Sequence, residues 1–330
     1  MSADLTANDA QKTAEQIKLE NEASKLMAQA KKRMEQNFLI SFFQASGQSK
    51  YEDAADMIER ASTKYKLAKA WSKAADGYLR LAEDVYARIG SAHEQGTNFV
   101  EAANCFKKID SERAIECFKK AAKTFADIGR LAIAAKHLKE CGDLLELKER
   151  KLEEAMKAFE AAADLYQSEE QQSTANQCKL RVAQIAGELG KYETAFETFE
   201  ECARHAAENN LLKYSAKAYL LQAGICRLCF QDPVGVLNAC ERYKDIDPLF
   251  LNSREDELLR DLANASEQGD QDLFANKLGS YDDISRLDAW KTTLLLRAKK
   301  RINEFGIMGN SSNNNNNNGG GGALDEDDLT

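Results

Sequence analysis

The stretch Ser111-Glu-Arg-Ala-Ile-Glu-Cys-Phe118 decides the fold, because its alanine-then-phenylalanine pair returns twice along the chain. At intervals of 41 and 40 residues the sequence repeats Ala114 with Phe118 as Ala155 with Phe159 and Ala195 with Phe199. An alanine one turn before an aromatic residue lies on the same helix face, so a neighbouring backbone can approach over the alanine while the ring fills the gap beside it. A related pair half a period away, Ala134 with Leu138, indicates a second helix in each period.

Two helices in a period of about 34 to 47 residues are typical of an α-solenoid, in which stacked repeats share one continuous core. The amino-acid composition also favours a helical fold. The chain has 330 residues, of which 43% are apolar and 30% charged, and only two prolines, Pro233 and Pro248. The first 230 residues are rich in strong helix formers, which predicts an all-α fold with few or no strands. The function to expect is binding along an extended surface.

Charge and cysteine content limit the classes of function. The net charge of −9 disfavours nonspecific nucleic-acid binding, although an average can conceal a basic face. Eight scattered cysteines behind a polar N-terminus indicate reduced thiols at buried helix positions. Cys226 with Cys229, and Cys202 with His205, have metal-like spacings, but no second pair completes either one, so we expect neither metal nor cofactor. No apolar run approaches the ~20 residues of a membrane span.

The N-terminal region contains an apolar cluster that admits two interpretations. Residues 5–36 read as a helix, and residues 44–49 as a small polar loop. Between them five large apolar residues have no common helix face: Phe38, Leu39, Ile40, Phe42 and Phe43. The cluster is either a local core under the loop or an exposed patch that touches a membrane or partner.

Further along, the same spacing of about 20 residues between small-and-bulky pairs predicts two helices between Tyr51 and Arg88, the second ending at Gly90. Another helix is predicted over 91–108. It is followed by a candidate N-cap for the next helix in Asp110-Ser-Glu112. Beyond Asn210 the sequence repeat becomes weaker, and long helices are expected over 212–230, 250–267 and 285–303. We therefore predict a helical-repeat domain over 1–230 with an apolar loop at 37–49, and a capping helical bundle over 231–305.

The last 25 residues change character. The asparagine and glycine runs in 306–322 predict a flexible linker, since they cannot bury apolar surface. The chain then ends in Ala323-Leu-Asp-Glu-Asp-Asp-Leu-Thr330. Four acids at a terminus are compatible with a solvated tail, whereas the flanking leucines favour a tethered docking peptide.

Several segments resemble the alpha-SNAP family. They are Tyr281-Asp-Asp-Ile-Ser-Arg-Leu-Asp-Ala-Trp290 with the following 291–300, Leu211-Leu-Lys-Tyr-Ser-Ala-Lys-Ala-Tyr219, Gly129-Arg-Leu-Ala-Ile-Ala-Ala-Lys-His137, and the Asp-Glu-Asp-Asp-Leu329 ending. The resemblance covers about residues 15–305 and the last eight, but not the linker at 306–322. It implies a TPR-like α-solenoid of antiparallel helix hairpins capped by a helical bundle.

By the same resemblance the protein is expected to be an adaptor and not an enzyme. Family members bind the four-helix SNARE bundle of syntaxin, SNAP-25-like and VAMP-type helices. They recruit the hexameric ATPase NSF and stimulate ATP-driven disassembly of the bundle in vesicle fusion and ER–Golgi transport. The implied location is cytoplasmic and peripheral on vesicle, Golgi and target membranes. Neither a cofactor nor nucleic acid is expected.

The resemblance also suggests site residues. Arg130 and Lys136 match family positions that face the SNARE bundle, and the other basic candidates are Lys179, Arg181, Lys213, Lys217, Lys108 and Lys69. One family lysine is replaced by Gln177, and each cation taken alone is also compatible with a solvated surface residue. The cluster Phe38, Leu39, Ile40, Phe42 and Phe43 would contact membrane. The candidates for binding and stimulating NSF are Leu329, Asp325, Glu326, Asp327, Asp328 and Glu267.

Two rival classes differ in what they require. A generic helical-repeat scaffold would bind short peptides in isolation, whereas the adaptor needs a folded helical bundle. An enzyme would need a reactive constellation, yet the sequence has no phosphate-binding glycine motif and no metal-spaced pair among His93, His137 and His205.

Overall fold

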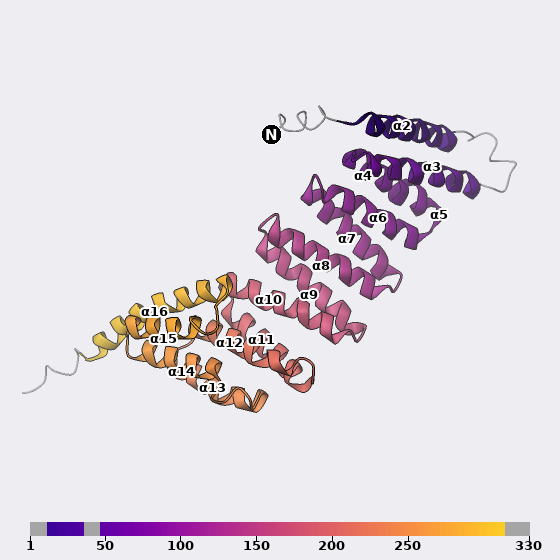
Figure 1. The fold of residues 1–330 in the computed structure, drawn as a ribbon. Helices are drawn as coiled ribbons and strands as arrows, with labels where there is room; N and C mark the ends of the chain where they lie inside the picture. Colours follow the sequence, from indigo (N-terminus) through magenta and orange to yellow (C-terminus); the bar gives the residue numbers. More distant parts are fainter. Residues whose placement is uncertain (1–11, 36–46, 314–330) are drawn as a thin grey trace, which may run out of the picture. The chain divides into compact units, whose positions relative to one another are not determined.

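A computed structural model describes residues 12–35 and 47–313, and no strand occurs within these two ranges (Figure 1). The all-α prediction is confirmed. Packing divides the chain into two compact units, Met1–Arg181 (unit 1) and Val182–Thr330 (unit 2). The domain boundary at residue 230 stays a prediction, because packing alone does not define where a repeat array ends.

From Gly47 onward, unit 1 is a succession of antiparallel helices joined by short turns (Figure 1). The helices of the unit are α2 (Ala14–Glu35), α3 (Gly47–Leu67), α4 (Trp71–Arg80), the π-helix η2 (Leu81–Tyr86), α5 (Ala87–Ile89), α6 (Ala92–Phe106), α7 (Ser111–Asp127), α8 (Leu131–Leu147), α9 (Leu152–Ser168) and α10 (Gln172–Glu188), which contains the boundary with unit 2. Among them, α4, η2 and α5 form one unbroken run.

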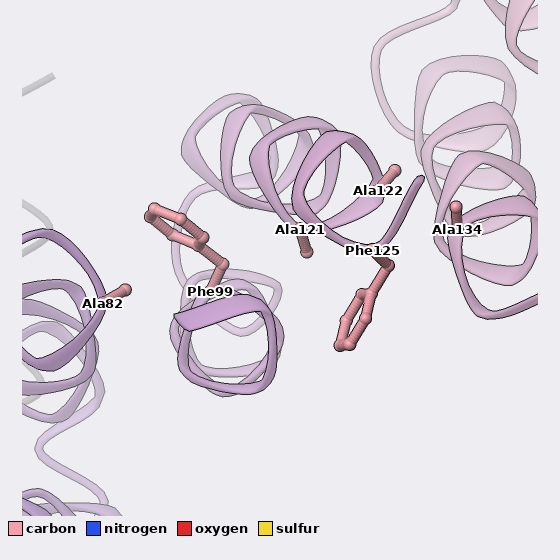
Figure 2. Packing of buried hydrophobic residues seen from close by; sticks show 6 residues of the cluster. All are labelled: Ala82, Phe99, Ala121, Ala122, Phe125 and Ala134. Carbon is pink, nitrogen blue, oxygen red and sulfur yellow. The ribbon is translucent and has the colours of Figure 1, made fainter. Parts of the chain in front are cut away.

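The repeated alanine and phenylalanine pairs build the core of unit 1. Ala114 and Phe118 of α7, and Ala155 and Phe159 of α9, are almost completely buried. Helix α8 comes so close to α9 that a Cβ on Gly142 would lie 2.8 Å from the Phe159 ring. Figure 2 shows a neighbouring cluster, in which the side chains of α6 and α7 lie among alanines of η2, α7 and α8: Phe99, Phe125, Ala82, Ala121, Ala122 and Ala134. Small residues thus set the helix spacing that the sequence pattern predicted.

Turn chemistry fixes where the helices start and stop. The Asp110 carboxylate accepts a hydrogen bond from the Arg113 backbone N–H at 3.0 Å, which confirms the predicted N-cap of α7. Gly90 and Gly129 adopt the left-handed conformation at helix ends (φ 80° and 73°), where a side chain would be strained.

Unit 2 contains the predicted long helices and two that the sequence analysis did not anticipate, α13 and α15. The bounds are α11 (Tyr192–Glu208), α12 (Lys213–Leu228), α13 (Pro233–Ile246), α14 (Arg254–Glu267), α15 (Gln271–Asp282) and α16 (Ala289–Asn313). Pro233 opens α13 at a position where its missing N–H costs nothing, and Asp232 caps that helix at the Gly235 N–H.

A buried polar network joins α11, α12 and α13. The Arg227 guanidinium donates to Glu200 (Nε to Oε1, 2.8 Å) and lies 3.7 Å from the centre of the Phe196 ring. The Tyr243 hydroxyl donates to the same Glu200 oxygen at 2.8 Å. Because a buried charge is tolerated only when it is paired and hydrogen-bonded, these partners hold three helices in one arrangement.

Helix α16 is held by side chains that reach the ends of earlier helices. The Trp290 indole donates to the Gln184 carbonyl at 2.9 Å. Arg297 donates to the carbonyls of residues 187 and 188, and Arg301 to those of residues 228 and 230. These arginines bind main-chain carbonyls at or just after the ends of α10 and α12, where carbonyls lack i+4 helical partners.

Two boundary predictions were wrong. The expected loop over 44–49 is shorter, because α3 begins at Gly47. Weak helix formers are tolerated in a first turn, whose N–H groups need no helical partner. The expected linker also starts later, because α16 extends to Asn313. Prolonging an existing helix adds a hydrogen bond per residue without a new nucleation step.

The thiols fit the structural interpretation. All eight cysteines are free and buried. Burial raises the pKa of the Cys117 and Cys229 thiols to about 11, which disfavours the reactive thiolate. Over residues 12–35 and 47–313 there is no cluster of side chains suited to a metal ion, and no helix there is long and apolar enough to cross a membrane.

Candidate functional site

Helix α8 carries the two basic residues that the sequence analysis placed first. Its inner side is buried through Ala134, Ala135 and Cys141. Arg130 and Lys136 are exposed, Arg130 at the N-cap and Lys136 in the second turn. Both candidates therefore lie exposed within the first two turns of one helix.

Neither cation has an ion-pair partner within the described part of the chain. Of the acids of α8, Glu140 pairs with Lys107 at 2.6 Å, and Glu146 pairs with Arg181 of α10. The first two helical turns of α8 contain no acid. A positive potential therefore develops at this end of α8 in a protein whose net charge is negative.

The α10 candidates are less available than the pattern suggested. Arg181 is engaged with Glu146, a mostly buried carboxylate, and Lys179 is half-buried and also has an interaction partner. Gln177, at the position of the family lysine, is exposed. Of these two helices, α8 therefore has the candidate cations without acidic partners, and α10 does not.

Lys69 and Lys108 occupy turns instead of a helix face. Both are exposed, and they follow α3 and α6 respectively. Lys69 has φ 58°, a left-handed conformation that usually selects glycine. Each turn also exposes a large aliphatic side chain, Leu67 at 65% and Ile109 at 48%.

His137 connects this surface to the core. Its ring stacks on Phe118 and Phe125 of α7, with centroids 5.7 and 5.9 Å away, and its Nδ1 has no hydrogen-bond partner among the described residues. Burial, followed by the charge of the adjacent Lys136, lowers the pKa of His137 to about 4. The imidazole is therefore neutral at physiological pH and acts as part of the core.

The outer surface of α7 contrasts with that of α8. Its cations face acids on neighbouring helices: Arg113 with Asp76 at 3.3 Å, Lys120 with Glu83 at 2.7 Å, and Lys119 with Glu154 at 3.9 Å. At the start of α9, Lys151 pairs with Glu112 at 2.7 Å. Three of the four cations of α7 are thus paired with acids, and only the exposed Lys123 has no ion pair among the described residues.

In unit 2, Lys213 and Lys217 lie in the first two turns of α12 and are half-buried. Lys213 lies 5.3 Å from the centre of the Tyr214 ring, and Leu211 and Tyr214 are exposed at 89% and 73%. Glu267 is the exposed last residue of α14. The start of α12 thus offers cations and large apolar side chains together.

Two groups of candidates lie outside the described residues. They are the apolar cluster Phe38, Leu39, Ile40, Phe42 and Phe43, and the tail residues Asp325, Glu326, Asp327, Asp328 and Leu329.

Sequence reasoning missed the counter-ions of the basic surface. Lys66 of α3 pairs with Glu101 of α6 at 2.5 Å, as Lys107 does with Glu140. Hydrogen bonding to Glu101 raises the pKa of Lys66. A search for charged residues at the repeat period would have found the lysines, which are 41 residues apart, and the glutamates, which are 39 apart.

A succession of antiparallel helices joined by short turns defines a helical-repeat protein. The profile of the soluble NSF attachment protein family matches residues 21–303, and the chain belongs to this family.

Relatives are similar over most of their lengths. The alpha-soluble NSF attachment protein of Vitis vinifera is 45% identical over 77% of this chain and 87% of its own. The protein of the same name from Homo sapiens is 38% identical over 86% and 95%. A probable vesicular-fusion protein sec17 homolog of Schizosaccharomyces pombe is 33% identical over 84% and 96%.

Proposed function

We propose that this protein is an adaptor that binds the four-helix SNARE bundle through the outer surface of α8 and recruits the ATPase NSF, which then disassembles the bundle. Family membership supports the attachment to NSF in vesicle fusion. The role is one of binding and stimulation, and the ATPase supplies the chemistry.

One observation carries the placement of the bundle: Arg130 and Lys136 are exposed and lack acidic partners over the described residues, whereas three of the four cations of the neighbouring α7 are paired with acids. Acidic helices are attracted to such uncompensated charge, which sets orientation and association rate more than affinity. In unit 2, Lys213 and Lys217, beside the exposed Leu211 and Tyr214, offer a second mixed basic and apolar contact.

The same proposal assigns roles to segments outside the described residues. The cluster Phe38, Leu39, Ile40, Phe42 and Phe43 contacts the membrane on which the bundle is anchored. Partial burial of a few such side chains gives weak and reversible association. The tail Asp325, Glu326, Asp327, Asp328 and Leu329, with Glu267, contacts NSF, and Leu329 supplies the apolar anchor. The protein is then cytoplasmic and peripheral on vesicle, Golgi and target membranes.

The test is a pull-down of the protein from detergent extract, with ATP or with a non-hydrolysable analogue. Retention of SNAREs together with NSF under the non-hydrolysing condition alone is the expected result. Retention of neither would overturn the proposal, and so would the capture of isolated peptides in place of the assembled bundle.

Two variants separate the roles within this experiment. Leu329→Ala should keep the bundle and NSF bound and lose most of the stimulated ATP turnover. Phe42→Ser with Phe43→Ser should slow disassembly on liposomes and leave it almost unchanged in detergent. Equal losses in both settings would indicate that the two phenylalanines belong to a local core.

A further inference from the structure

Two ion pairs of unit 1 are copies of each other. Lys66, at the end of α3, contacts Glu101 in α6 at 2.5 Å, and Lys107, just after α6, contacts Glu140 in α8 at 2.6 Å. In both pairs the lysine side chain is 40% exposed and the glutamate 34%. Each ammonium also lies 5.9 Å from the centre of an aromatic ring, Tyr78 in the first case and Phe118 in the second.

The third repeat inverts this arrangement. One period after Lys107 and Glu140 stand Lys148 and Arg181, so the acid of the pair has become a cation. Arg181 pairs with Glu146, two residues before Lys148, and Lys148 is exposed without an ion pair within the described residues. The glutamate is therefore not required for stacking, because the third repeat packs without it.

The second of the two pairs adjoins the basic surface of α8, and the first lies one repeat earlier. Glu140 follows Lys136 by four residues, which places the two side chains on one side of the helix. Lys107 reaches this side of α8 from the preceding repeat through its contact with Glu140. On this side of α8, Lys136 has no acidic partner among the described residues, whereas one turn later Glu140 neutralises Lys107.

Partly exposed ion pairs contribute little to stability and exchange partners readily. A glutamate that neutralises a lysine beside a binding surface also repels an acidic partner. We infer that Lys66 and Lys107 are reserve contacts for an acidic helical bundle, and that Glu101 and Glu140 restrain them and so limit the affinity of the surface. This inference rests on the proposed function, in which the partner is such a bundle.

The restraint suits a partner that must be held and then released. With both lysines fully available, the surface would gain two cations and lose two acids, and the complex would dissociate more slowly. In the wild-type protein the bundle instead has to displace Glu101 and Glu140 before it can contact Lys66 and Lys107. The contacts with these two lysines therefore form last and break first.

The test compares two double variants of the full chain for binding to a recombinant soluble four-helix SNARE bundle. Glu101→Gln with Glu140→Gln releases the reserve lysines. The matched control is Glu83→Gln with Glu112→Gln, which removes two more exposed acids (46% and 67%, against 34% for Glu101 and Glu140) that are likewise paired with lysines, Lys120 and Lys151. Both variants change the net charge by the same amount, and thermal melts establish that each is folded.

We expect the first variant to bind the bundle about tenfold more tightly at low salt, with a steeper loss of affinity as salt rises, and the control to stay within about twofold of wild type. Unchanged or weaker binding by the first variant overturns the inference, and so does an equal gain by both variants, which would reflect net charge alone. Wild-type protein that does not bind the bundle at all would instead refute the proposed function.

Discussion

Helices α7 and α8 have equal lengths of 17 residues and follow each other in the chain, yet they begin in opposite ways. Helix α7 starts from Asp110, whose carboxylate caps a backbone N–H and favours the positive end of the helix dipole. Helix α8 starts from Arg130, which makes no side-chain cap and places a cation at the same end. The N-cap side chain therefore stabilises α7, whereas the N-cap side chain of α8 contributes no such hydrogen bond.

The difference shows that α8 does without a stabilising cap that α7 has, as is expected if this end of α8 serves binding. Cations alone do not mark a site, because Arg113 and Lys120 of α7 are neutralised by acids of neighbouring helices. A cation at the N-cap does not mark one either, since Lys151 starts α9 and is paired with Glu112. What distinguishes Arg130 is the lack of both a cap and an acid among the described residues. This missing counter-charge is the reason for which we propose the α8 surface as the binding site.

The largest expected effect concerns the contact between the two helices. Below pH 6.5 the unfolded chain binds a proton at His137 that the folded chain excludes until pH about 4, so stability is lost as the pH falls through this window. The loss at pH 4.5 amounts to ~2–3 kcal/mol. Urea unfolding should show this component in wild type and not in His137→Leu. Parallel pH dependences of the two proteins would contradict it.

The next effect compares charge reversal on the outer surface of α8 with charge reversal on that of α7. Arg130→Glu with Lys136→Glu should weaken SNARE-bundle binding by about 30-fold, or ~2 kcal/mol, because attraction becomes repulsion. The matched control, Lys119→Glu with Lys123→Glu, makes the same charge change on two exposed residues of α7. Binding measured by calorimetry at low salt should fall less than about threefold for this control. Equal weakening by both variants would remove the distinction between the helices.

The smallest effect gives α8 the start that α7 has. Arg130→Asp should raise the free energy of unfolding by ~0.5–1 kcal/mol, since a carboxylate at the N-cap can accept an N–H bond and favours the dipole. The same variant should bind the bundle less tightly. Urea denaturation and a binding isotherm on one preparation measure both. A variant that is destabilised yet binds normally would show that Arg130 serves the fold and not the partner.

The repeat fold could be predicted because burial repeats with the period of the structure. Ala114 and Phe118 recur where the next helix pair needs a small residue and a ring. Helices α13 and α15 were missed because their short segments lack this pair, and their position depends on contacts such as that of Tyr243 with Glu200. Helix ends also depend on neighbours, so the start of α3 and the end of α16 were misplaced.

The site was predictable only in part. The resemblance located Arg130 and Lys136, and the structure shows both exposed. It could not show that Arg181 is engaged with Glu146, or that Lys107 reaches Glu140 from 33 residues away in sequence. A charge pattern reports which residues are present, whereas availability depends on which side chains the stacking brings together.

The arginines of α16 have a consequence for biosynthesis. Arg297 and Arg301 are the partners of four main-chain carbonyls at the ends of α10 and α12. Until the ribosome has released residue 301, the ends of both helices lack these donors, however long the rest of unit 2 has been outside the tunnel. Unit 2 therefore cannot complete its packing before α16 has emerged, and a nascent chain stalled before α16 presents unfinished helix ends to chaperones.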